Sequence, residues 1–193
     1  MLLDYGRIAG RAAIIRQRCG FFDKDPPYST TIVTRKCFSD LHVTGAALPR
    51  SVLEMVQVGA SGKVLYYNRK ASESDRRVGI AHGLHHLLSD LRENPDFGLR
   101  ECNVAARRLE QVGRLPPDGA EIACDIFAGE LLVPFDVLDR YAPASLFPRG
   151  EADQHAFADE TDRIASRFNV PAWFMGWRLR DLCHLRRSNL NIR

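Results

Sequence analysis

R-R-V-G-I-A-H-G-L-H-H-L-L-S-D, residues 76–90, is the stretch around which the chain is organised. Its apolar side chains recur at helical spacing and form one stripe: Ile80, Ala81, Leu84, Leu87 and Leu88. His82 and His86 lie four residues apart, so a helix places both imidazoles on one face, about 6 Å apart along its axis. That separation allows the two side chains to share one metal ion.

The residue between the two histidines decides what such a site could do. In the motif H-E-x-x-H, two histidines hold zinc and the glutamate is the general base. Here the glutamate position is Gly83, so the metal-binding half of the motif is present and the catalytic half is absent. Histidine pairs at this spacing also occur as ordinary core or surface residues, so the assignment needs a third ligand.

A second helix, predicted from residue 120 to Pro134, supplies candidates for that ligand. Glu121 and Asp125 lie four apart on one of its faces, and Glu121 follows His86 by about 35 residues. This is the ligand spacing of zinc peptidases with a His₂Glu site. Asp125 would then orient a ligating imidazole from behind. A carboxylate near a helix N-terminus can also simply complement the helix dipole, which is the alternative for Glu121.

Three further residues are weaker candidates. Cys124 would reach the metal as a soft additional ligand, or it is a buried packing residue. His85 lies on the flank of its helix opposite to position 83, so it cannot replace the missing carboxylate without distortion; it is either a metal-adjacent group or a surface histidine. His155, in a helix predicted over 151–168, is a candidate to contact substrate or a developing oxyanion.

The rest of the chain predicts a mainly helical α+β domain with a small antiparallel sheet. Two β-type runs, 52–58 and 64–67, flank the turn 59–62 and would pack on the helix of His82. Ser29 or Thr30 would cap a short helix that reaches about Leu41, and Ser72 or Ser74 would cap the His82 helix. Further helices are predicted at 3–18 and 135–141. We expect one domain over residues 1–193.

Composition excludes several classes of protein. The chain has 193 residues, 45% of them hydrophobic and 26% charged, as in ordinary globular proteins. A net charge of +3 predicts weak nucleic-acid binding or none. No apolar run approaches the ~18 residues that would span a membrane. Five scattered cysteines without a C-x-x-C motif indicate free thiols, and with the charged N-terminal segment they predict a cytoplasmic protein.

Several of these segments resemble the ImmA/IrrE-type metallopeptidases. The matching pieces are V-L-Y-Y-N-R (64–69), R-R-V-G-I-A-H-G-L-H-H-L-L (76–88) and E-I-A-C-D-I-F-A-G-E-L-L-V-P (121–134). The segment F-N-V-P-A-W-F-M-G-W-R-L resembles the family's closing helix–turn–helix-like part. The resemblance covers about residues 28–182. It departs from the family at Gly83, where the family has its general-base glutamate.

The resemblance implies a gluzincin-like, zinc-dependent domain of bacterial or phage origin. Such proteins typically cleave a partner transcriptional repressor and so switch on genes of stress response or mobile-element transfer. By position, His82, His86 and Glu121 would bind the zinc ion.

Three functions follow: a zinc endopeptidase that uses another base or none, a non-catalytic pseudo-protease that binds its partner, and a nucleic-acid-binding regulator. We favour a peptidase-family regulator with impaired catalysis. The sequence does not distinguish a natural glycine at position 83 from a glycine introduced there to inactivate a protease.

Glycine in mid-helix costs about 1 kcal/mol relative to alanine. The sequence alone therefore predicts that Gly83→Glu would raise the melting temperature slightly and create or increase cleavage of the partner.

Overall fold

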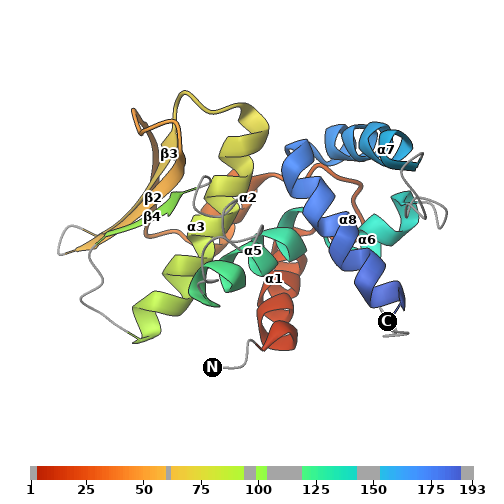
Figure 1. Ribbon diagram of the computed structural model, residues 1–193. Helices are drawn as coiled ribbons and strands as arrows, with labels where there is room; N and C mark the ends of the chain where they lie inside the picture. Colours follow the sequence, from red (N-terminus) through yellow and green to blue (C-terminus); the bar gives the residue numbers. More distant parts are fainter. Residues whose placement is uncertain (1–3, 60–61, 94–98, 104–118, 143–152, 188–193) are drawn as a thin grey trace. The chain divides into compact units, whose positions relative to one another are not determined.

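The computed structural model describes residues 4–59, 62–93, 99–103, 119–142 and 153–187 (Figure 1). They separate into two compact units. The first consists of Met1–Lys24 and Ser29–Leu131, and the second of Asp25–Tyr28 and Leu132–Arg193. The predicted class, mainly helical α+β with a small sheet, is confirmed. The single domain expected over residues 1–193 stays a prediction, because two compact units can still fold together.

The described residues of the first unit contain four helices. They are α1 (Tyr5–Cys19), α2 (Thr30–Cys37), α3 (Glu73–Glu93) and α5 (Gly119–Leu132), the last of which ends one residue past the unit boundary. The Ser29 hydroxyl accepts a hydrogen bond from the Ile32 amide at 3.3 Å, and the Ser72 hydroxyl accepts one from the Asp75 amide at 3.1 Å. Both bonds satisfy amides that the first turn leaves unpaired.

The sheet has four strands in the order β1-β3-β2-β4. Their bounds are β1 Leu41–Ala46, β2 Val52–Gly59, β3 Gly62–Asn68 and β4 Leu99–Asn103. Strands β2 and β3 form the predicted antiparallel hairpin, with Gly59 opposite Gly62. The prediction of a purely antiparallel sheet is wrong, because β1 pairs with β3 in parallel. The short helix expected to reach Leu41 ends at Cys37, which frees residues 41–46 to form this strand.

The start of β2 is held in place by a buried asparagine. The Nδ2 atom of Asn68 donates to the carbonyls of Pro49 and Val52, both at 2.9 Å. Immediately afterwards the register between β2 and β4 slips between Val52 and Glu54. Such a bulge redirects the side chains that follow it. The side chains of Glu54 and Val56 consequently both lie against α3 and are fully buried.

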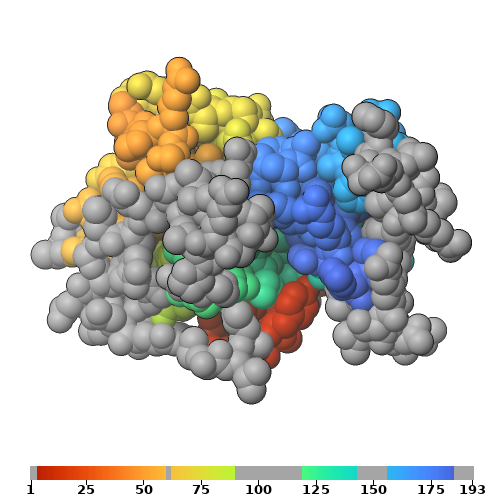
Figure 2. Space-filling view, viewed as in Figure 1, coloured from red at the N-terminus to blue at the C-terminus, as the bar shows by residue number. Residues whose placement is uncertain are grey.

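Helix α3 lies along one face of the sheet (Figure 1). Two of its glycines, Gly79 and Gly83, provide the close approach. A Cβ atom at Gly79 would lie 3.2 Å from the Cβ of Leu53 on β2. Figure 2, drawn from the same side, shows the β2–β3 hairpin and the start of α3 at the surface. The sheet thus covers one side of α3 and leaves another side for the histidines.

The second unit contains α6 (Phe135–Tyr141), α7 (Asp153–Phe168) and α8 (Ala172–Arg187). Helices α7 and α8 pack together across a turn at Asn169, as the predicted helix–turn–helix-like ending requires. The buried Arg178 donates from Nη2 to the Val133 carbonyl at 2.9 Å, and its guanidinium lies 3.7 Å from the centre of the Phe135 ring. No helix within the described residues is long and apolar enough to cross a membrane.

Candidate metal centre

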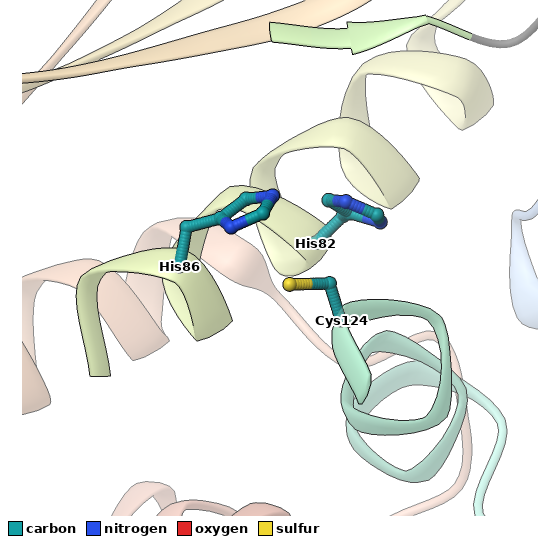
Figure 3. Close-up of side chains that lie close together, drawn as sticks. All are labelled: His82, His86 and Cys124. Atoms are coloured by element: carbon teal, nitrogen blue, oxygen red, sulfur yellow. The ribbon is translucent and has the colours of Figure 1, made fainter. Parts of the chain in front are cut away.

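Two histidines of α3 form one side of the site. His82 and His86 are 2% and 1% exposed, and their ring centres lie 5.1 Å apart. Figure 3 shows both imidazoles projecting from α3, with the thiol of Cys124 on α5 directed toward them. The helical spacing therefore places the pair on one buried face, as predicted.

Glu121, on the first turn of α5, reaches both histidines. Its Oε2 atom lies 3.1 Å from Nε2 of His82, and its Oε1 atom lies 3.2 Å from Nε2 of His86. Two ligand atoms of one tetrahedral zinc ion lie about 3.4 Å apart, given bond lengths near 2.1 Å. Burial opposes ionisation of Glu121, but hydrogen bonds from the two histidines hold its pKa well below its usual range. The three side chains therefore converge with the spacing and charge of a metal-binding set.

Asp125 stands behind one of these histidines. Its Oδ1 atom lies 3.0 Å from Nδ1 of His82, on the opposite side of the ring from Glu121. A carboxylate in this position fixes the proton on Nδ1 and leaves Nε2 free to bind a metal. This is the contact that the spacing of Glu121 and Asp125 suggested.

Cys124 offers an alternative third ligand. Its Sγ atom and one nitrogen each from His82 and His86 lie within 4.8 Å of one another. Burial opposes ionisation of the thiol, but the charge of His82 and hydrogen bonds with His82, His85 and His86 lower the pKa of Cys124 to about 5. Cys124 can therefore bind a soft metal through this thiol, and it also packs in the core. The structure is compatible with both roles considered from the sequence, an additional ligand and a buried packing residue.

His85 is buried, and its interpretation as a surface histidine is wrong. Its side chain is 2% exposed, its ring centre lies 5.1 Å from that of Phe127, and its Nδ1 atom lies 3.4 Å from Sγ of Cys124. The cause is the position of α5, which covers the flank of α3 that carries His85. His85 thus contacts a candidate ligand and faces away from position 83.

The surroundings of Gly83 were not foreseen from the sequence. A Cβ atom there would lie 2.9 Å from Cδ1 of Leu65, 3.0 Å from Cγ2 of Val56 and 3.1 Å from Cγ of Glu54. These distances are shorter than ordinary van der Waals contact. The occupied space opposes the gain in helix propensity and so argues against the expectation that Gly83→Glu would raise the melting temperature, which stays a prediction.

Glu54 is the functional candidate that sequence reasoning missed. It is fully buried, and neither carboxylate oxygen has a hydrogen-bond partner among the residues that the structure describes. Burial raises the pKa of Glu54 to about 7; the charges of His82 and His86 act to lower it, and those of Glu121 and Cys124 to raise it. The available signal was a glutamate on the apolar face of the alternating run V-L-E-M-V-Q-V.

The remaining features are the candidate residue His155 and a cavity beside α2. His155 belongs to α7 in the second unit, and its side chain lies outside the described residues, so its role stays a prediction. A cavity of about 700 Å³ is bordered by α2, β1, β3 and the first turns of α3, with Arg35, Arg76 and Arg77 in its wall. None of the histidines, Glu121 or Cys124 lines this cavity.

A helix carrying two buried histidines, a second helix carrying a carboxylate and a small sheet beside them are the parts of a metallopeptidase-type domain with a candidate metal site. The sequence model of a peptidase family, described as the IrrE N-terminal-like domain, matches residues 37–180. The chain therefore belongs to this family of metallopeptidases. A comparison with curated proteins gave no match.

Proposed function

We propose that His82, His86 and Glu121 bind one zinc ion. The donor set of two neutral imidazole nitrogens and one carboxylate oxygen is that of His₂Glu zinc sites. The observation that carries the proposal is the approach of the two Glu121 oxygens to the two Nε2 atoms, at 3.1 and 3.2 Å. The orientation of His82 by Asp125 supports it independently.

We further propose that the protein is a regulator that recognises a partner transcriptional repressor at this centre and cleaves it. Membership of the metallopeptidase family and the buried donor set support a hydrolytic centre. A net charge of +3 is too small to argue for nucleic acid as the partner, and we expect at most weak, salt-sensitive binding to it.

Each residue has a distinct task in this proposal. When bound, the zinc ion would acidify water and polarise the scissile carbonyl. Glu121 and the histidines hold the ion, and Asp125 keeps the His82 ring in the tautomer that binds through Nε2. Position 83 contributes no carboxylate, so cleavage requires a base from elsewhere in the chain.

The decisive experiment combines binding and cleavage with one candidate substrate. The zinc-loaded protein is incubated with the repressor encoded beside its gene, and Glu121→Ala and chelator-treated protein serve as controls. We expect the zinc-loaded protein to bind and cleave the repressor, and both controls to fail to cleave. A repressor that is neither bound nor cleaved, or cleavage that survives chelation, would contradict the proposal. Zinc-dependent binding without cleavage would instead establish the pseudo-protease alternative.

A further inference from the structure

We propose that Glu54 is the general base of this centre and replaces the carboxylate that position 83 lacks. The inference rests on the proposed zinc-dependent hydrolysis and names the residue that completes it. In H-E-x-x-H the general base is the glutamate of the helix, whereas Glu54 belongs to strand β2.

The side chain of Glu54 occupies space that a side chain at position 83 would need. A side chain at position 83 would start 3.1 Å from Cγ of Glu54, so the Glu54 side chain lies where a glutamate on α3 would begin. Position 83 follows His82 directly and is rotated by about 60° from His86 around the helix. The carboxyl group of Glu54 therefore approaches the histidine pair from the sheet side, and Gly83 leaves room for it.

The carboxyl group of Glu54 is buried without hydrogen bonds to the described residues. Burying a carboxylate without hydrogen bonds is strongly unfavourable, and buried polar groups in folded proteins are nearly always paired. Both oxygens of Glu54 lack such a partner among the described residues. An unpaired group retained at this cost is typical of functional sites, where the missing partner is a substrate or a reacting water.

A second buried glutamate in the same unit shows the contrast. Glu130 is 9% exposed, and its Oε1 atom accepts a hydrogen bond from the hydroxyl of Tyr5. Its carboxylate thus has an evident structural partner. Glu54 instead follows a β-bulge that directs it toward α3, and it is influenced electrostatically by His82, His86, Glu121 and Cys124. The two residues therefore form a matched pair for a test.

The proposed step is ordinary amide hydrolysis. A carboxylate oxygen of Glu54 accepts one proton from the attacking water as the water oxygen bonds to the scissile carbonyl carbon. The same carboxyl group then gives this proton to the nitrogen of the leaving amine as the carbon–nitrogen bond breaks. The products are a carboxylic acid and an amine, and Glu54 returns to its ionised form.

The test uses acetohydroxamate, which chelates a bound metal and presents a hydroxyl to a neighbouring carboxylate. Zinc affinity and acetohydroxamate affinity are measured by calorimetry for the unmodified protein, Glu54→Gln and the control Glu130→Gln. We expect zinc affinity to be unchanged in both variants. Acetohydroxamate should bind about tenfold more weakly to Glu54→Gln alone, because a hydrogen bond to a charged group is lost.

Cleavage of the repressor supplies a second readout. Glu54→Gln should lower its rate by about 10²–10⁴, whereas Glu130→Gln should leave it close to that of the unmodified protein. Glu54→Leu repeats the comparison if the glutamine variant folds poorly. Without metal and at pH 8, both Glu54 variants should melt above the unmodified protein, because a buried carboxylate without hydrogen bonds has been replaced by an uncharged group.

The outcomes separate this inference from the function on which it rests. Unchanged acetohydroxamate affinity in Glu54→Gln overturns the base assignment and leaves the zinc site standing. A loss of zinc affinity of about a hundredfold would make Glu54 a ligand, which also overturns it. Lower melting temperatures for both Glu54 variants would show a structural role instead. If the unmodified protein binds no zinc, the proposed function fails and the base assignment fails with it.

Discussion

Gly83→Ala tests whether position 83 is glycine because the sheet needs the space. Alanine should gain about 1 kcal/mol from helix propensity. The added methyl group would meet Leu65, Val56 and Glu54 at 2.9, 3.0 and 3.1 Å. All three side chains are fully buried, so none can move into solvent. Overpacking of this kind costs about 1–3 kcal/mol, which exceeds the propensity gain over most of its range.

The expected net effect is a loss of about 1 kcal/mol in the free energy of unfolding, or about 2–4 °C in melting temperature for a chain of this length. Both are measured by thermal and urea denaturation of the metal-free protein. Gly10→Ala is the matched control, because Gly10 lies within α1 and a Cβ atom there would have no neighbour within 4 Å. That variant should be stabilised by roughly 0.5–1 kcal/mol. If Gly83→Ala is stabilised to the same extent as Gly10→Ala, the steric account of Gly83 is refuted.

Three other predictions concern the neighbours of the centre. Asp125→Asn should weaken zinc binding about 10–100-fold, and an unchanged affinity would show that its contact with His82 has no orienting role. Cys124→Ser should change zinc affinity by less than about threefold, whereas a far larger loss, matching that of Glu121→Ala, would favour a His₂Cys site. In the metal-free protein, the pKa of Glu54 rises from 4.5 in the unfolded state to about 7 in the folded state. Between these pH values the folded state holds a proton that the unfolded state releases. Stability should therefore fall as pH rises through this interval, by up to about 3 kcal/mol, and urea titrations of Glu54→Gln at pH 5 and 8 should lack this fall.

The proposed metal-binding residues were accessible from the sequence because helical geometry is local. The spacing of His82 and His86 fixes their shared face, and the spacing of Glu121 and Asp125 fixes theirs. We expected the two faces to meet because two histidines need a third ligand to form a metal site. The family model covers the segments that carry these residues, because it matches residues 37–180.

Glu54 and strand β1 were not accessible in this way. The face to which Glu54 points depends on the strand register and on the bulge before this residue. Both are set by pairing with β4, which lies about fifty residues further along the chain. Strand β1 pairs in parallel with β3, and in its sequence L-H-V-T-G-A the apolar alternation covers only four residues before Gly45. The surface alternative for His85 was wrong because the burial of this residue depends on α5, which comes from a distant part of the chain.

The measurement that tests the central claim most directly is the metal content of the purified protein. The unmodified protein, prepared without chelators, should carry close to one zinc ion per chain, and Glu121→Ala should lose most of it, because three protein ligands are the usual minimum for a site of this type. Glu130→Gln, changed in a buried glutamate outside the donor set, should retain its zinc. An unmodified protein that contains no zinc and takes up none when it is supplied would contradict the account.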